Sequence, residues 1–305
     1  MLNDPSRLVL FLGGEGTNDP RLLLDAASRA ADRGFSMVAA PDHIGSPGSW
    51  HEGWTILTAI AARIPGIRVG SLVSPFLLHH PGHLAKRIAS IDRLSDGRVT
   101  LGIGAGDFPA EFEAFGLPHD VPYEERVARL EEWVAVVSSL LEARGPVSFD
   151  GRWYTLNGAD LTGLPVQRPR PPFWFGGDGD RVLRLVANHG QGWSTMTSSL
   201  AAFRSRRDML QSHLTAAGRS LRDVEASVFL KWVFDRTGYH RWVSAVVPRT
   251  RQFQEFYDNE VGSAAEAEAF VSAWRSEGVL TFVLWVWPSD RVIEAIDAAS
   301  AIVGG

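Results

Sequence analysis

Asp42 and His43 stand side by side directly after an apolar run at residues 35–40. An imidazole exchanges a proton near neutral pH, and a neighbouring carboxylate can form a hydrogen bond with an imidazole or with a ligand. The pair therefore predicts acid–base chemistry, with His43 as the group that carries the proton. The alternative interpretation is a turn aspartate followed by a surface histidine.

A glycine-rich turn, Gly-Gly-Asp-Gly, occupies residues 176–179, and a helical pattern follows it. Glycine lets the backbone approach an anion closely, and the free N–H groups at a helix N-terminus bind phosphate. Arg181 and Arg184 would add positive charge, whereas Asp178 would oppose an anion unless its side chain points away. The turn predicts a phosphate site; an ordinary glycine-rich turn is the alternative.

Three further glycines alternate with apolar residues over residues 102–106. Their spacing differs from the G-x-G-x-x-G of dinucleotide-binding folds, and no acidic residue ends a strand about twenty residues later. We interpret them as backbone room for a flat ring against a strand end. Tight packing of a strand on a helix is the alternative.

His79, His80 and His83 lie close together, but Pro81-Gly82 interrupts them and no acidic ligand is near. Neighbouring histidines on a loop seldom converge on one ion, so we predict no metal site. One of these imidazoles remains available for a cofactor.

The chain has 11 tryptophans, and several lie at or after strand ends, where they can wall a pocket for a flat molecule. The tryptophans that we predict to line a substrate pocket are Trp50, Trp193, Trp232 and Trp285. Residues 231–258 mix aromatic and charged residues without clean periodicity, as a segment that covers a substrate would. A plain surface insertion is the alternative.

Strand-like and helix-like patterns alternate along the chain. The strand-like runs are residues 7–12, 35–40, 68–73, 98–103, 172–175, 192–195, 224–233 and 280–287. About eight β/α units of this length favour a closed parallel sheet, so the sequence predicts an α/β fold of the (β/α)8 TIM-barrel type. In such a barrel the chemistry lies at the C-terminal ends of the strands, where the residues named above fall.

Two segments break the alternation. Glycines and prolines at 146–170 predict a hairpin excursion after the fourth strand, and a second insertion is expected at about 233–262, after the seventh. We expect residues 1–305 to form one domain, because this length suits one barrel and is too short for two.

The composition excludes several functions. No cysteine is present, which removes disulfides and thiolate chemistry, and the net charge of −5 comes without a basic stripe for nucleic acid. No run of eighteen uncharged apolar residues predicts a membrane span, and the first residues do not form a signal peptide. We therefore expect a cytoplasmic protein that acts on a small molecule.

Several spaced motifs extend over about residues 7–195. They are Val69-Gly-Ser-Leu-Val73, His80-Pro81, Leu84-Ala-Lys86, residues 91–106, Glu111, Phe115-Gly116, residues 149–154, residues 165–172, Gly176-Gly177 and Gly192-Trp193. Together they resemble the central signature of luciferase-like monooxygenases and of their coenzyme F420-dependent relatives. The resemblance implies a barrel with an insertion after the seventh strand, usually a homodimer, that binds FMN or F420.

In the F420 branch, an Asp-His pair after the second strand is typical, and the histidine lies over the deazaflavin ring as proton donor or acceptor. The resemblance therefore assigns His43 the catalytic role. It also implies a bulge at Leu72-Val73, often with a cis peptide bond, behind the ring. The cofactor-binding residues that we predict are Asp42, Leu72, Val73, Ser74, His79, Ala105, Gly106, Glu111, Gly176, Gly177 and Asp178.

Three positions depart from the family pattern. His79 replaces a frequent arginine, Asp107 replaces a common tryptophan, and Gln191 replaces the usual aspartate of an Asp-Gly-Trp motif. These departures put one polar contact to the cofactor in doubt and indicate an altered substrate pocket.

The resemblance and the Asp42-His43 pair favour an F420-dependent oxidoreductase. Hydride would pass between C5 of the deazaflavin and a small organic substrate, with His43 supplying or taking the proton. The alternatives are an FMN-dependent monooxygenase that receives reduced flavin from a partner reductase, and a cofactor-binding barrel without turnover. A flavin or F420 reductase is a candidate electron source for either of the two redox functions. The sequence does not identify the substrate.

Overall fold

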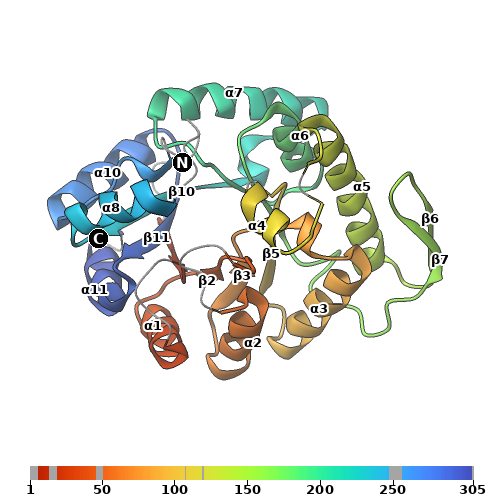
Figure 1. Cartoon of the computed structure of the whole chain (residues 1–305), viewed down its shortest axis with the longest axis horizontal. Coiled ribbons are helices and arrows are strands. Elements are labelled where there is room, and N and C mark those ends of the chain that lie inside the picture. The colour runs from red at the N-terminus through yellow and green to blue at the C-terminus, as the bar shows by residue number, and fades with distance from the viewer. Residues whose placement is uncertain are drawn as a thin grey trace.

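The computed structural model describes residues 6–13, 19–45, 51–106, 108–118, 120–246 and 256–303. Eight parallel strands within these ranges form a barrel: β1 (Arg7–Phe11), β2 (Met37–Ala40), β3 (Arg68–Ser71), β5 (Val99–Gly104), β8 (Phe173–Gly176), β9 (Gly192–Ser194), β10 (Glu225–Val233) and β11 (Thr281–Trp287). β1 pairs with both β2 and β11, and β3 pairs with β5, so the sheet closes on itself. The predicted TIM barrel is confirmed (Figure 1).

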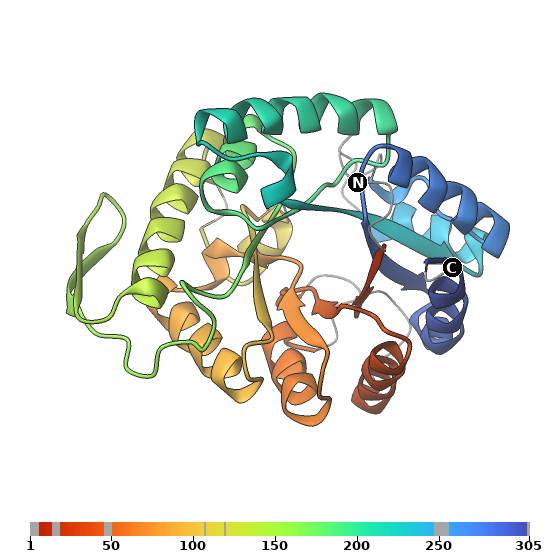
Figure 2. The ribbon, with the colours of Figure 1, turned by 180° about the vertical axis from the view of Figure 1, so that it is seen from behind.

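Helices surround the barrel as an outer ring, which is visible from both sides (Figure 2). The larger ones are α1 (Pro20–Asp32), α2 (Gly53–Arg63), α3 (Pro81–Leu94), α5 (Tyr123–Glu142), α6 (Asp180–His189), α7 (Leu200–Ala216), α10 (Ala264–Ser276) and α11 (Val292–Val303). The shorter elements are β4 (Ser74–Pro75), α4 (Pro109–Ala114) and α8 (Arg236–Val246), with 3-10 turns at Phe76–Leu78, Leu221–Asp223 and Ser289–Arg291. None of the helices in the described ranges is both long enough and apolar enough to cross a membrane.

Local sequence signals explain where α1 begins and ends. The Asp19 side chain accepts a hydrogen bond from the Arg21 amide at 2.9 Å, and Pro20 occupies the first turn. Gly34 follows the helix with a φ of 77°, a conformation that costs glycine little. The aspartate cap, the first-turn proline and the glycine that follows the last turn thus define both ends of α1.

The two faces of each strand belong to different apolar clusters. On β11, Val283 and Trp285 lie in the cluster that fills the barrel, whereas Phe282 and Leu284 lie in the cluster between strands and helices. Successive side chains of a strand point to opposite faces, so residue parity decides which side chains reach the barrel mouth.

The insertions follow the predicted positions with one difference. Residues 146–170 contain an antiparallel hairpin, β6 (Val147–Asp150) and β7 (Thr155–Ala159), which projects beside α5 (Figure 1). The segment after β10, interpreted from the sequence as an insertion without clean periodicity, contains α8. Tyr239 and Trp242 are buried on this helix, and Val243 and Val246 pack against the same interior cluster, so the apolar side of α8 has helical spacing.

Candidate active site

Asp42 is the centre of a buried polar network behind the end of β2. Only 3% of the residue is exposed, and its Oδ2 accepts hydrogen bonds from Ser74 Oγ at 2.5 Å and Trp54 Nε1 at 3.1 Å. His79 Nε2 lies 2.7 Å from the same oxygen. Burial acts to raise the pKa of Asp42, but the hydrogen bonds from His79 and Ser74 outweigh it and hold the pKa below its ordinary value.

The network brings together three residues that the sequence assigned to the cofactor: Asp42, Ser74 and His79. Their polar atoms face one another, so they position the strand ends that they join. His79, in the place of the family's arginine, is held on its other side by Trp133, whose Nε1 donates to the His79 carbonyl at 3.0 Å.

His43 is oriented by Glu111, which α4 carries over the loop after β2. The Nδ1 atom of His43 lies 2.8 Å from Glu111 Oε2, while Oε1 accepts from the amides of Ile44 at 2.6 Å and Gly45 at 2.8 Å. Burial tends to raise the pKa of Glu111, yet the hydrogen bonds from His43 and the two amides lower it overall. An ionised carboxylate beside Nδ1 keeps the ring hydrogen on Nδ1, so Nε2 is the atom left to exchange a proton.

The sequence placed Glu111 at the cofactor, and the structure gives it a different immediate contact. Its carboxylate binds the imidazole and the loop backbone, which makes Glu111 a positioning residue for His43. The Phe108 ring meets the imidazole edge-on with ring centres 5.2 Å apart, and restricts it further.

An apolar floor lies at the ends of β3, β5 and β8. The peptide bond between Leu72 and Val73 is cis, as the resemblance implied. The Val73 side chain fills space that Gly102, Gly104 and Gly176 leave. A Cβ at Gly104 would lie 2.5 Å from Val73 Cγ2, and a Cβ at Gly102 or Gly176 would lie 3.2 or 3.1 Å from Val73 Cγ1. The glycines thus leave room for one valine side chain at the ends of these strands, and its apolar surface suits a flat ring.

Ala105 and Gly106 contribute backbone to this region. The Ala105 side chain packs in the cluster between strands and helices, so only its main chain is available to a ligand. Gly106 has a φ of 82°, and a Cβ there would come within 2.8 Å of the Phe112 ring. A side chain at this position would meet both backbone strain and a clash.

The turn after β8 leads into α6 and offers backbone donors. Gly177 has a φ of 116°, and Gly179 is the cap residue of α6 without a side-chain hydrogen bond to the helix. The first N–H groups of a helix otherwise have no intrahelical acceptor, so they fit an anion. The predicted phosphate site at Gly176 and Gly177 thus has suitable geometry.

The Asp178 carboxylate bonds to the segment after β9, and its contact with a cofactor stays a prediction. Its carboxylate accepts hydrogen bonds from Thr195 Oγ1 at 2.8 Å and from the Met196 amide at 3.0 Å. Burial raises its pKa. The two arginines are also engaged elsewhere: Arg181 binds Glu131 and Glu124, and Arg184 binds Asp180. Their charges are balanced on the helix surface.

Two of the tryptophans predicted for the pocket lie on the outer side of the barrel. Trp193 is fully buried and stacks on Phe203, with ring centres 5.5 Å apart, and its Nε1 donates to the Gly177 carbonyl at 3.0 Å. Trp232 belongs to the same outer cluster. Because strand parity turns both rings toward the helices, neither lines the mouth. Trp50 lies outside the described residues.

Trp285 faces the barrel interior, as its prediction required, and its indole N–H donates to the Gly13 carbonyl. It belongs to an aromatic group over β10 and β11 that the sequence did not predict as a unit. This group, called the aromatic cluster below, consists of Tyr239, Trp242, Phe256, Tyr257, Trp285 and Trp287.

Lys231 was also missed as a candidate. It has the inward parity of Phe229 on β10, and only 2% of the residue is exposed. Counting parity from Phe229 would have placed its ammonium inside the barrel. Burial lowers the pKa of Lys231 to about 7.

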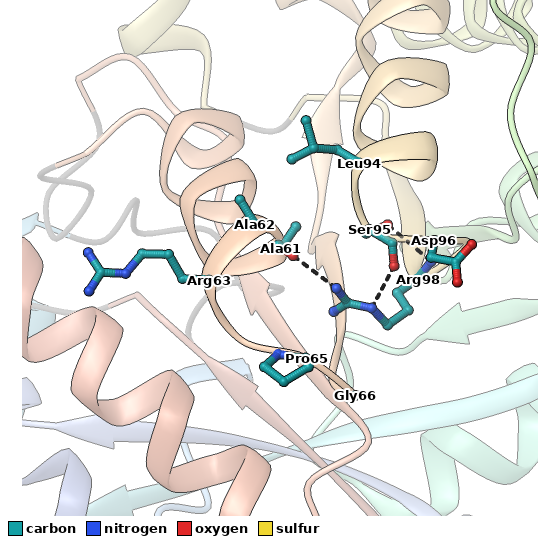
Figure 3. Close-up of a pocket in the computed structure, with 9 residues that line it drawn as sticks. All are labelled: Ala61, Ala62, Arg63, Pro65, Gly66, Leu94, Ser95, Asp96 and Arg98. Atoms are coloured by element: carbon teal, nitrogen blue, oxygen red, sulfur yellow. Dashed lines mark hydrogen bonds between the residues drawn. The ribbon is translucent and has the colours of Figure 1, made fainter.

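Two further features of the described structure bear on where a ligand can bind. The described residues contain no group of three or more His, Asp or Glu placed to hold a metal ion. A surface cavity lined by Ala61, Pro65, Leu94 and Arg98 lies where β3 and β5 begin, at the opposite end of the barrel (Figure 3). The Arg98 guanidinium there is bound to backbone carbonyls, including that of Ala61 at 2.9 Å, and serves the fold.

Comparisons with known proteins agree with this geometry. The family model of luciferase-like monooxygenases matches residues 8–280. The chain is 30% identical over 216 residues to an F420-dependent glucose-6-phosphate dehydrogenase of Gordonia bronchialis, covering 68% of this chain and 62% of that protein. It is 30% identical over 192 residues to a 5,10-methylenetetrahydromethanopterin reductase of Archaeoglobus fulgidus, covering 63% and 54% respectively. The matches thus span less than two thirds of each relative.

Solved structures share the fold over nearly the whole chain. An F420-dependent secondary alcohol dehydrogenase in complex with an F420-acetone adduct superposes with a TM-score of 0.82 at 19% identity, covering 97% of this chain and 99% of that one. The monooxygenase RslO1 from Streptomyces bottropensis gives a TM-score of 0.80 at 21% identity, covering 97% and 98%. With the family model matched from the first barrel strand nearly to the last, the chain belongs to the luciferase-like monooxygenase family.

Proposed function

We propose that this protein is an F420-dependent oxidoreductase that exchanges a hydride between the deazaflavin and a small organic substrate. The observation that carries the proposal is the His43–Glu111 pair, 2.8 Å apart at the open end of the barrel. Two relatives described above support it. The dehydrogenase is named as F420-dependent, and the other relative is named as a reductase.

The residues at the mouth suit the chemical parts of that cofactor. Val73 would support the face of the ring, and the backbone of Ala105 and Gly106 would lie along it. The N–H groups at the start of α6, beside Gly177, would take the phosphate. F420, when bound, supplies hydride transfer at C5, and the protein supplies orientation and electrostatics.

His43 moves the proton in this proposal. When the substrate is reduced, protonated Nε2 donates to the substrate atom that gains negative charge; in the reverse direction, neutral Nε2 accepts that proton. The Glu111 carboxylate holds Nδ1 and stabilises the imidazolium form by its charge. Buried Asp42 holds His79 and Ser74, which keeps the neighbouring strand ends in register.

An FMN-dependent monooxygenase is the second candidate, supported by the structural similarity to the monooxygenase RslO1. Titration of the purified protein with F420 and, separately, with FMN distinguishes the two by the change in cofactor fluorescence. We expect tight binding of F420 and weak binding of FMN. Tight binding of FMN alone contradicts the proposal. Tight F420 binding without reduction or oxidation by any alcohol, aldehyde, imine or enone in a 420 nm absorbance screen favours a binding protein without turnover.

A further inference from the structure

Lys231 carries a charge-bearing group into the barrel with few partners. Its ammonium donates to the Phe256 carbonyl and lies 4.7 Å from the centre of the Phe256 ring. An ammonium can donate three hydrogen bonds, and the described residues provide this one acceptor. The carboxylates of Asp258 and Glu260, which follow Phe256 in the chain, act to raise the pKa of Lys231. Burial of the ammonium outweighs them and lowers that pKa overall.

Two indole N–H groups of the aromatic cluster have the same shortage. Trp242 and Trp287 are 8% and 9% exposed, and their buried Nε1 atoms have no acceptor among the residues that the structure describes. Leaving a buried donor without an acceptor costs free energy, so native proteins usually satisfy such groups. Two of them in one cluster, beside an under-coordinated ammonium, mark a place where a bound ligand would supply acceptors that the described residues do not.

The rings of the cluster form a continuous aromatic wall. Trp285 lies 6.0 Å from Trp242 and 5.6 Å from Tyr257, and Tyr239 lies 5.9 Å from Trp287, between ring centres. Their faces and edges suit another flat ring, which prefers stacked or edge-to-face contacts at such distances.

The aromatic cluster also adjoins the proposed cofactor floor. Leu72 belongs to the same interior cluster as Trp242 and Trp285, and Val73 packs against that cluster. A molecule held by the aromatic cluster would therefore share the barrel mouth with a ring supported by Val73.

We propose that Lys231, Trp242 and Trp287 form a substrate subsite for a flat ring compound that bears a carbonyl or carboxylate oxygen. The oxygen takes the hydrogen bonds that these three donors lack, and the rings of the aromatic cluster take the body of the compound. The role of the bound compound as substrate rests on the proposed function, whereas its binding to these three donors does not.

Isothermal titration calorimetry of the full chain with three probes tests the subsite. The probes are 2-naphthoate, which has both ring and oxygen, naphthalene, which has only the ring, and hexanoate, which has only the oxygen. We expect 2-naphthoate to bind at least about tenfold more tightly than either of the others. Equal binding of 2-naphthoate and hexanoate, or no binding of 2-naphthoate, overturns the proposal.

Three variants locate the binding. Lys231→Met, Trp242→Phe and Trp287→Phe should each weaken 2-naphthoate binding about tenfold, because each removes a donor and keeps an apolar side chain. Trp232→Phe is the matched control: the same chemical change on the neighbouring residue, which faces the helices. We expect it to leave binding unchanged. Equal loss in the control, or no loss in the three, contradicts the assignment.

Two measurements distinguish a loss of ligand binding at the subsite from a loss of folding and from a loss of F420 binding. Thermal melts show whether a variant is folded; Lys231→Met should melt at least as high as the wild type, because it removes a buried charge, and a large drop would assign Lys231 a structural role. Titration of the same variants with F420 should show unchanged affinity. If the wild type fails to bind F420 but binds 2-naphthoate through these donors, the proposed function fails and the subsite stands.

Discussion

The two halves of the barrel mouth are built differently. Over β2, β3, β5 and β8, hereafter the cofactor half, small residues leave room and the titratable side chains bond to one another, as in Asp42 with His79 and Glu111 with His43. Over β10, β11 and α8, hereafter the aromatic half, large rings line the barrel interior, and the indole donors of Trp242 and Trp287 have no acceptor within the described ranges. The contrast fits our two proposals: the half whose polar groups are satisfied by one another fixes a ring and a proton carrier in place, and the half with unsatisfied donors binds the oxygen of a ligand.

The largest effect is expected from His43→Gln in the cofactor half. Turnover should fall by about 10²–10⁴-fold, because the proton carrier is lost, while F420 affinity stays within about threefold. Steady-state rates and F420 titration of the same samples check this. His240→Gln, at a histidine whose side chain is 56% exposed, is the control and should change neither value. Parallel losses of turnover and affinity would contradict the role of His43.

Glu111→Gln should lower turnover about tenfold, since an amide cannot stabilise the imidazolium as a carboxylate does. It also predicts a pH dependence of stability. The folded pKa of Glu111 lies below its ordinary value, so its stabilising effect is present above about pH 4.3 and is lost as the pH falls through the folded pKa. The difference in unfolding free energy between wild type and variant should therefore shrink on acidification. A difference that is constant with pH would argue against an ionised Glu111.

Gly177→Ala tests whether the turn after β8 binds the phosphate. Alanine at a φ of 116° is strained, and the amides at the start of α6 should shift, so F420 affinity should fall about tenfold. Gly218→Ala is the matched control, because Gly218 also has a positive φ, 70°, and has open space around its Cα, but follows α7. Both variants should lose about 1 kcal/mol of stability. Equal F420 affinity in the two would remove the phosphate from this turn.

Lys231 predicts a smaller effect in the aromatic half. Because its folded pKa of about 7 lies below its unfolded value, the folded state binds fewer protons above pH 7 and stability rises with pH there. The rise from pH 7 to pH 8 should be about 1 kcal/mol from this group. Chemical denaturation of wild type and Lys231→Met at both pH values measures it. A rise of the same size in the variant would show that Lys231 is not its source.

The sequence predicted the fold well because the barrel depends on a repeated pattern. Alternating apolar runs located all eight barrel strands. α8 was missed although Tyr239, Trp242, Val243 and Val246 have helical spacing, because the mixture of aromatic and charged residues around them was interpreted as an irregular insertion.

The candidate site was predicted only in part, for two physical reasons. Trp193 and Trp232 were placed at strand ends without regard to parity, and parity turns both toward the helices. Glu111 and His43 are 68 residues apart, and their contact depends on how α4 folds back over the loop after β2. No local pattern encodes that contact.

The most direct test of the account is the imidazole of His43 itself, observed by ¹⁵N NMR in protein labelled at histidine. The chain has nine histidines, and comparison with His43→Gln assigns the resonances. The His43–Glu111 contact predicts that the neutral ring carries its hydrogen on Nδ1, facing Glu111, and F420 bound over the ring should shift the Nε2 resonance at saturation. A neutral ring with its hydrogen on Nε2, or no shift of either nitrogen with F420, would contradict it.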